Sequence, residues 1–456
     1  MNNSIHQTII VGGGFTGLFT ALHLAHQHYP RSVILIDRNE RFCFKPLLYE
    51  YFSGEMEAMQ VVPRYEDLLK GSGVIFVQDS VQSIDLKARE VKLTSGSYNY
   101  SNLVLALGSI TGYFGVEGAK EYALPLWTQQ DAIAIDRHLR DCLQKAVQIE
   151  DSEQRRMLLT VVVVGGGPSG VEMAATLADL LPHWYAGMGG KAEEIRVILL
   201  NHGEKILEGD INSQLRQTAE RQLQNRAVPV EMLLGAEATA IYPNTIEYKR
   251  DGKSEKLSAA TTLWTTGTAT HPLIQDLPIS KEKRDHHHRP YVTPTMQLLD
   301  FPEVFAGGDC AAVQNSSLPP TAQVAYQQGA AIADNLKALA LKDELQPAQV
   351  NVRGSLLKLG LEDAAANIYN KFELDGKIGH LIRQGTYLEL LPSPIHDFKA
   401  TSQWLRDEIF RQHTGTDITG KTAMRALQIA GGVAVGVLVG RKLLQILGDE
   451  DKSERS

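Results

Sequence analysis

The chain has 456 residues, a formal net charge of −8, 43% hydrophobic residues and 21% charged residues. This length and composition predict two or three domains with a sizeable core and exclude global disorder. The acidic balance and the lack of a long basic stretch argue against a nucleic-acid partner. Because Cys43, Cys142 and Cys310 are far apart and form no C-x-x-C pair, we expect neither a redox dithiol nor a bound metal.

The chain begins with a pattern that predicts a βαβ unit. Strands at 8–11 and 33–36 and a helix at 18–28 surround the motif G-G-G-F-T-G. In a dinucleotide site, the first glycine permits a tight turn, the next lets the pyrophosphate approach, and the last allows close helix packing. The helix N-terminus attracts phosphate, and an acid after the second strand can bind a ribose. The predicted cofactor-binding residues are Gly12, Gly14, Phe15, Thr16, Gly17, Asp37 and Arg38.

The same pattern returns at 159–200 and predicts a second dinucleotide site containing Gly165, Gly167 and Gly170. The usual acid is replaced by Asn201. A carboxylate there would bind the 2′-hydroxyl of NADH and repel the 2′-phosphate of NADPH, so Asn201 favours use of NADPH. The alternative is that Asn201 simply hydrogen-bonds the ribose of NADH. Two such units in one chain imply two dinucleotides, and the useful pair is FAD with NADPH or NADH.

Three further segments carry a resemblance to the two-dinucleotide-binding-domain flavoproteins. They are the strands leading to Gly108 and Gly267, and the segment 301–309, whose Asp309 is implied to hold the flavin ribityl chain. Within this superfamily the chain resembles the type II NADH dehydrogenases, which are non-pumping NAD(P)H:quinone oxidoreductases. The motifs F-K-P-L-L-Y-E at 44–50 and A-Q-V-A-Y-Q-Q-G at 322–329 carry that resemblance.

The family resemblance implies roles for four more side chains. Lys45 is placed beside the flavin, and Glu172, expected in the first turn of its helix, is placed near flavin and nicotinamide. Gln323 and Gln327 share a helix face and are implied to contact the quinone and, for Gln323, the flavin. The alternatives are a glutamate that complements the helix dipole and an alanine-rich packing helix with surface glutamines.

Asn201, the loop near 281–290 and the C-terminal tail are most similar to a cyanobacterial and plastid subgroup. This likeness implies a naphthoquinone such as demethylphylloquinone, or plastoquinone, as the electron acceptor. Two other functions stay open: a soluble ferredoxin- or rubredoxin-type reductase, and a flavin-based redox sensor.

We therefore predict an α/β fold with two Rossmann-like domains and a C-terminal membrane-associating region. The FAD domain comprises 1–157 and 270–345, and the NAD(P)H domain 158–269 is inserted between them. Residues 346–415, with short strands at 356–360, 364–369 and 372–374 and helices at 377–387 and 404–410, form the quinone and interface region.

The last segment, 416–456, is interpreted as an apolar anchor with a charged tail. Residues 426–440 carry no charge, and apolar character extends to 447. Because a span needs about twenty residues, a shallow anchor in the lipid surface is favoured over a transmembrane helix or a soluble packing helix. This predicts attachment to the cytoplasmic face of a membrane (thylakoid or plasma membrane in a cyanobacterium), with a homodimer left open.

Overall fold

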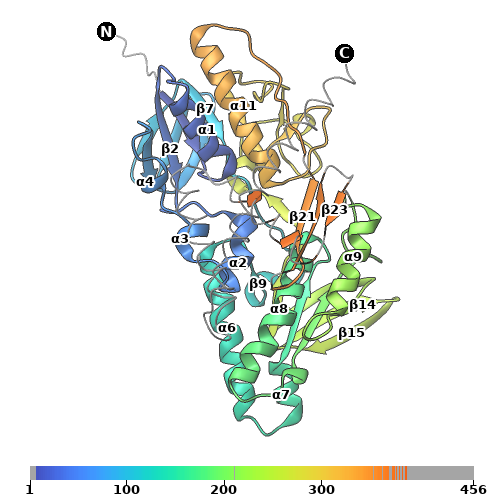
Figure 1. Ribbon diagram of the computed structural model, residues 1–456. Helices are drawn as coiled ribbons and strands as arrows, with labels where there is room; N and C mark the ends of the chain where they lie inside the picture. The colour runs from blue at the N-terminus through green and yellow to red at the C-terminus, as the bar shows by residue number, and fades with distance from the viewer. Residues whose placement is uncertain are drawn as a thin grey trace, which may run out of the picture.

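The computed structural model describes 7–209, 211–352, 354–361, 363–368 and 372–374, with six isolated residues between 376 and 387 (Figure 1). The predicted helix at 404–410 and the apolar segment 426–447 lie outside the described residues, and most of 377–387 does too. In the described part of the chain, no helix combines the length and apolarity that crossing a bilayer requires.

The first domain is built on a five-stranded parallel sheet that draws on both ends of the described chain. In spatial order its strands are β19 (Val304–Ala306), β7 (Asn102–Leu105), β1 (Gln7–Val11), β2 (Ser32–Asp37) and β3 (Ile75–Gln78). Helices α1 (Phe15–His26) and α11 (Ala322–Leu341) pack against each other, as the neighbouring blue and orange ribbons in Figure 1 show. Segments about 300 residues apart therefore share one domain.

The second domain repeats this architecture with its own parallel sheet. Its strands are, in order, β12 (Glu231–Leu233), β11 (Arg196–Leu200), β10 (Thr160–Val164), β16 (Thr261–Trp264) and β9 (Leu124–Pro125). Strand β10 is buried along its whole length, as expected for a parallel strand covered on both faces. Helix α8 (Pro168–Gly187) follows β10, with Pro168 in its first turn, where a missing N–H costs nothing.

Strand β9 and helix α6 (Gln129–Gln148) lie with the second sheet, upstream of the boundary that the sequence suggested at residue 157. Strand β9 pairs with β16, and the apolar face of α6 joins the core of the second domain. Strands β8 (Ser109–Thr111) and β17 (Thr268–Thr270) pair antiparallel. They are the two strands through which the chain passes between the domains.

Smaller elements complete the two domains. Three-stranded antiparallel sheets are formed by β4 (Val81–Asp85), β5 (Glu90–Leu93) and β6 (Ser97–Asn99), and by β13 (Ala236–Tyr242), β14 (Thr245–Arg250) and β15 (Lys253–Ser258). The other described α-helices are α2 (Leu48–Phe52), α3 (Ala58–Val61), α4 (Tyr65–Leu68), α5 (Ala119–Tyr122), α7 (Ser152–Leu158), α9 (Ser213–Gln224) and α10 (Pro272–Gln275). The 3₁₀ turns are η1 (Lys45–Leu47), η2 (Ala192–Glu194), η3 (Lys281–Lys283) and η4 (Gly308–Cys310). Strand β18 (Tyr291–Val292) pairs with β20 (Ala312–Val313).

The C-terminal strands β21 (Gly354–Lys358), β22 (Ala364–Ile368) and β23 (Phe372–Leu374) form an antiparallel sheet, close to the predicted positions. This sheet packs against α8 and α9 of the second domain, where Figure 1 shows β21 and β23. The α/β fold with two Rossmann-like sheets is thus confirmed, and the C-terminal sheet adds a third layer against the second domain.

Candidate active site

The two glycine motifs build the same backbone turn twice. Gly12 has φ +99° and Gly165 has φ +114°, the left-handed region that glycine alone adopts readily. A Cβ placed on Gly17 would lie 1.9 Å from the Gly12 carbonyl oxygen, and one on Gly170 would lie 1.8 Å from that of Gly165. The predicted tight turn and close helix approach are confirmed at both positions, because no side chain fits there.

Each turn leads into the N-terminus of a helix that is free to bind an anion. Gly14 precedes α1 and Gly167 precedes α8, and neither helix has a side-chain cap or an acidic residue in its first turn. A Cβ on either glycine would meet nothing within 4 Å. Unpaired N–H groups and the helix dipole therefore face open space, which fits a pyrophosphate in each domain.

The side chains of Phe15 and Thr16 take part in packing around α1. The Phe15 ring lies 5.2 Å from the Phe42 ring and 5.1 Å from the Phe44 ring, measured between centroids. The Thr16 hydroxyl donates a hydrogen bond to the Ala325 carbonyl at 3.1 Å. If these two residues hold a cofactor, their backbone N–H groups provide the contact.

A polar side chain after the second strand supports each glycine turn. Asp37 accepts a hydrogen bond from the Gly13 N–H at 2.7 Å, and Asn201 accepts one from the Gly166 N–H at 2.9 Å. The neighbouring Arg38 is exposed. Asn201 and Asp37 thus occupy equivalent positions in the two domains.

The amide of Asn201 does something that a carboxylate cannot do. Its Nδ2 donates to the carbonyl oxygens of Gly203 at 3.1 Å and Lys205 at 2.9 Å. The side chain therefore organises the loop after β11, in addition to leaving that position uncharged. Sequence reasoning weighed the missing charge of Asn201 and a hydrogen bond to the ribose of NADH, and did not find this role.

The flavin-side residues meet where the strands of the first sheet end. Asp309, in η4, accepts a hydrogen bond from the Ser109 hydroxyl at 2.9 Å. The Gly308 N–H donates to Gln328 Oε1 of α11 at 2.7 Å, which fixes η4 against that helix. Gly108 follows β7 with φ +63° and open space around its Cβ position. Asp309 is thus held at a sheet edge where ligands of open α/β folds bind.

Lys45 lies in η1, with its ammonium 3.6 Å from the centroid of the Trp127 ring, a cation–π contact. Protein atoms that displace water from the ammonium lower the pKa of Lys45, while the carboxylate of Asp309 acts in the opposite direction. Asp309 therefore lies close enough to Lys45 to act on its charge.

Helix α11 begins at Ala322, and the Thr321 hydroxyl caps it by accepting a hydrogen bond from the Val324 N–H at 3.3 Å. Gln327 Nε2 donates to the carbonyls of Gln323 at 2.8 Å and Asn351 at 3.1 Å, and its Oε1 accepts from the Asn351 N–H at 2.9 Å. Gln323 reaches the Gly354 carbonyl at 3.4 Å. The two glutamines therefore hold the segment that leads into β21, and their contact with a quinone stays a prediction.

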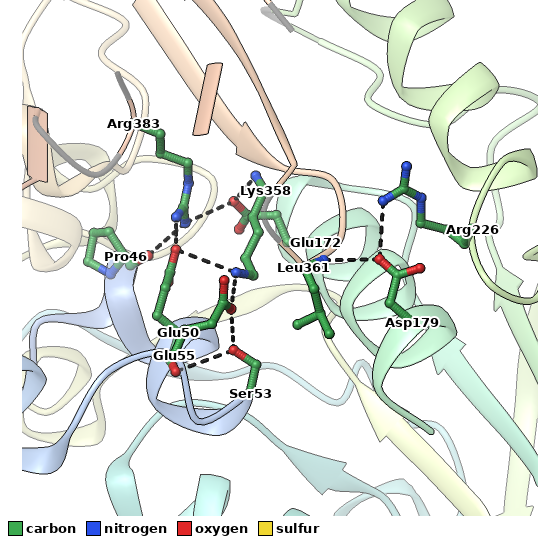
Figure 2. A network of polar contacts seen from close by, with 10 residues as sticks. All are labelled: Pro46, Glu50, Ser53, Glu55, Glu172, Asp179, Arg226, Lys358, Leu361 and Arg383. Atoms are coloured by element: carbon green, nitrogen blue, oxygen red, sulfur yellow. Dashed lines mark hydrogen bonds and ion pairs between the residues drawn. The ribbon is translucent and has the colours of Figure 1, made fainter. Parts of the chain in front are cut away.

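Five charged side chains form a buried ion cluster between the domains and the C-terminal sheet (Figure 2). None is more than 8% exposed. Its members are Glu50, Glu55, Glu172, Lys358 and Arg383. With three carboxylates and two cations, the cluster holds an excess of acid away from water, which is costly unless a proton compensates.

The contacts of the buried ion cluster connect the first domain, the second domain and the C-terminal residues. The Lys358 ammonium pairs with Glu55 and lies 3.8 Å from Glu50, while the Arg383 guanidinium pairs with Glu50 and lies 3.3 Å from Glu172. Glu172 also accepts the backbone N–H of Lys358 at 2.8 Å. These ion pairs therefore attach the C-terminal residues to α2 and α8.

Burial raises the pKa of Glu172 to about 7, although Arg383 and the Lys358 N–H act against this increase. Burial also favours the neutral form of Glu55, but Lys358 outweighs it and leaves the pKa of Glu55 lowered. A carboxyl group with this pKa can exchange a proton near neutral pH, which makes Glu172 a candidate for proton transfer.

The expected first-turn placement of Glu172 is wrong. Helix α8 begins at Pro168, which makes Glu172 its fifth residue, and no acid lies in the first turn. The alternative role of complementing the helix dipole is removed with it. Sequence reasoning missed Glu55, Lys358 and Arg383 as site residues, and the available signal was a charge inside an apolar strand pattern, as in S-L-L-K-L-G-L around Lys358.

Neither the histidine run nor Cys310 has the environment of a reactive or metal-binding group. Residues 286–288, three consecutive histidines, are exposed in a loop. Cys310 is fully buried beside Asp309, and its thiol points to the carbonyls of Leu105 and Gly307 at 3.3 Å each. Burial raises the pKa of Cys310 to about 11, so its thiol remains protonated and unreactive at neutral pH.

Comparisons with known proteins agree with this geometry. The family model of the pyridine nucleotide-disulphide oxidoreductases matches residues 6–329. Demethylphylloquinone reductase NdbB of Synechocystis is 30% identical over 89% of this chain and 97% of its own, and alternative NAD(P)H-ubiquinone oxidoreductase C1 of Arabidopsis thaliana is 31% identical over 88% and 81%. The solved structure of NDH2 from Plasmodium falciparum in complex with NADH has the same fold, with a TM-score of 0.79, 19% identity and coverage of 91% of this chain and 100% of that one.

The family match covers both glycine motifs, both crossover strands and Asp309. The relatives extend over the C-terminal sheet as well, since they align with nearly nine-tenths of the chain. The predicted FAD and NAD(P)H cofactors fit the two anion-binding helix ends. The chain therefore belongs to the pyridine nucleotide-disulphide oxidoreductases, in the branch of the type II NAD(P)H:quinone oxidoreductases.

Proposed function

We propose that the chain transfers electrons from NAD(P)H through FAD to a quinone. The observation that carries this proposal is the pair of free helix N-termini, on α1 and α8, each at the end of its own parallel sheet. Two dinucleotides bound at these ends approach each other across the space between the domains. FAD, when bound, supplies a centre that accepts a hydride and releases electrons singly or in pairs.

Residues of the chain would bind and orient the two cofactors and adjust the charge around them. The turns at Gly12 and Gly165 bring backbone N–H groups to the pyrophosphates, and Asp309 would accept hydrogen bonds from the ribityl chain. Lys45 would bring a positive charge that stabilises the negative charge of FAD when FAD is reduced. Glu172, in the buried ion cluster, can hold or give up a proton near neutral pH. These roles are supported by where the residues lie: the glycines before α1 and α8, Asp309 at the ends of the first sheet, and Glu172 in the buried ion cluster.

Anaerobic turnover of the purified holoprotein tests this proposal. NADH or NADPH oxidation is followed at the nicotinamide absorbance, with naphthoquinone, plastoquinone-type and iron–sulfur protein acceptors offered in turn. We expect rapid multiple turnover with a quinone and an equimolar yield of quinol. A protein that takes up no flavin, or that reduces only the iron–sulfur proteins, would overturn the assignment. Slow single turnover would favour a redox sensor instead.

We further propose a naphthoquinone such as demethylphylloquinone as the physiological acceptor. Support comes from the likeness to the Synechocystis relative that bears that name. The prediction is a higher kcat/KM for demethylated naphthoquinones than for plastoquinone analogues. We expect no proton pumping, so liposomes that acidify during turnover would contradict this assignment.

Membrane attachment through 426–447 is part of the proposal, because residues 426–440 carry no charge, lie between Arg425 and Arg441, and are followed by further apolar residues up to 447. Full-length protein should float with vesicles containing anionic lipid, whereas a chain ending at residue 415 should stay in the lower fractions. Equal flotation of both forms would refute this attachment. Protease protection in intact cells tests the cytoplasmic face, and light scattering tests whether the chain forms a homodimer.

A further inference from the structure

Phe114 combines three properties that its own packing does not explain. Its ring is 69% exposed, although phenylalanine is usually buried. Its backbone has φ +49°, in the left-handed region that a bulky residue adopts at a cost. Residues held in this way cluster at ligand-binding sites, where the strain is part of the function.

The loop that carries Phe114 is fastened to the second domain by the two residues that precede the ring, Gly112 and Tyr113. The Trp264 indole N–H donates to the Gly112 carbonyl at 2.9 Å, and the Gly112 N–H donates to Gly267 at 3.2 Å. The Tyr113 ring packs on Trp264, with centroids 5.8 Å apart. The position of Phe114 is therefore imposed by these neighbours.

The ring of Phe114 lies directly on Gly267. A Cβ added to Gly267 would lie 1.9 Å from Cε2 of Phe114, so only glycine permits this contact. Gly267 has φ +70° and follows β16. Its loop also touches the pyrophosphate turn, because a Cβ on Gly165 would lie 2.9 Å from Thr266 Cβ. Phe114 thus borders the crevice in which NAD(P)H binds.

The strand order assigns the half of NAD(P)H that lies near Phe114. Strand β10 has β11 on one side and β16 on the other. The adenosine ribose belongs at the end of β11, beside Asn201, and the pyrophosphate belongs at the α8 N-terminus. The nicotinamide half must then extend to the β16 side, where β17 and β8 also lead towards the first domain.

We propose that Phe114 is a positioning residue that packs its ring against the nicotinamide half of NAD(P)H. This inference rests on the proposed function and names a contact within the same site. A flat apolar ring held at the crevice edge offers a stacking surface to the nicotinamide or covers its ribose. The strained backbone keeps the ring beside Gly267, so little conformational freedom is lost on binding.

Equilibrium binding to the oxidised holoprotein tests this contact without catalysis. NAD⁺ and ADP-ribose, which lacks nicotinamide, are titrated by calorimetry into wild type, Phe114→Ala, Phe114→Leu and Phe114→Tyr. We expect Phe114→Ala to weaken NAD⁺ binding about tenfold, the size of one lost aromatic contact, and to change ADP-ribose binding by less than about twofold. Phe114→Tyr should bind NAD⁺ within about twofold of wild type.

Tyr122→Ala is the matched control, since Tyr122 is also an exposed aromatic, at 39%, in the same connection. NAD⁺ affinity of Phe114→Ala within about twofold of wild type would overturn the proposal, as would equal weakening for both ligands. If the alanine variant does not fold, Phe114→Leu, which fills a similar volume without an aromatic ring, takes its place in the same comparison of NAD⁺ with ADP-ribose. If wild type itself binds neither ligand, the proposed function fails, which is a different result.

Discussion

Replacing Asn201 with aspartate tests why the second phosphate turn is supported by an amide. The substitution keeps Oδ1, which accepts from the Gly166 N–H, but it turns Nδ2 into an oxygen that faces the carbonyls of Gly203 and Lys205. Two donated hydrogen bonds are lost, at about 0.5–1.5 kcal/mol each, so the loop is destabilised by about 1–3 kcal/mol. Oxygen–oxygen repulsion adds to this cost.

NADH distinguishes the two explanations of Asn201. If the residue acts only through its missing charge, Asn201→Asp should strengthen binding of the 2′-hydroxyl of NADH and weaken binding of NADPH. If it organises the loop, both cofactors should bind more weakly, by roughly 5- to 150-fold when the full loop cost is transferred to binding. We expect the second result, with an additional loss for NADPH from charge repulsion.

The assay is calorimetric titration of the oxidised holoprotein with NAD⁺ and NADP⁺. Asn244→Asp is the control, because Asn244 is exposed in the same domain and the change adds the same charge. Tighter NAD⁺ binding by Asn201→Asp would refute the loop-organising role. Asn201→Glu, which changes charge and length together, cannot separate the two explanations.

Three further outcomes follow from the same geometry. Burial raises the pKa of Glu172 to about 7, so from about pH 5 to about pH 7 the native state holds a proton that the unfolded chain has lost, and folding becomes less favourable as the pH rises. The Tm difference between wild type and Glu172→Gln should therefore fall over this range, and a flat difference would contradict it. Gly170→Ala should reduce NAD(P)H affinity while flavin stays bound, and Gly17→Ala should reduce flavin content, each through overpacking of about 1–3 kcal/mol; equal loss of both cofactors in both variants would disprove this separation. Lys358→Met should leave Glu55 buried without its partner and cost about 3–5 kcal/mol, seen as a lower Tm, and an unchanged Tm would show that Glu55 is neutral in the wild type.

Short local patterns in the sequence predicted most of the fold. The spacing of Gly12 and Gly17, repeated at Gly165 and Gly170, predicted both helix N-termini, because the need for positive φ and for close backbone approach arises within a few residues. By contrast, β9 was not predicted. It has only two residues, and its place beside β16 depends on a partner nearly 140 residues away.

The first-turn placement of Glu172 failed for a similar reason. Helix α8 begins at Pro168, so Glu172 is its fifth residue, and the role of Glu172 depends on partners outside the helix. Its neighbours in the buried ion cluster come from α2 and from residues after 350. Charge in a sequence predicts exposure unless the folded chain provides the opposite charge.

From the sequence alone, two dinucleotide sites, their order along the chain and their likeness to a flavoprotein family could be derived, since glycine geometry and strand–helix alternation are short-range properties. Only the tertiary structure determined that Asn201 supports the turn at Gly166, that Gln327 holds the approach to β21 and that Phe114 lies on Gly267. These contacts join residues that are far apart in the sequence, so no local pattern predicts them. They exist because packing two sheets and a third layer brings those residues together, at a free energy that only the whole fold provides.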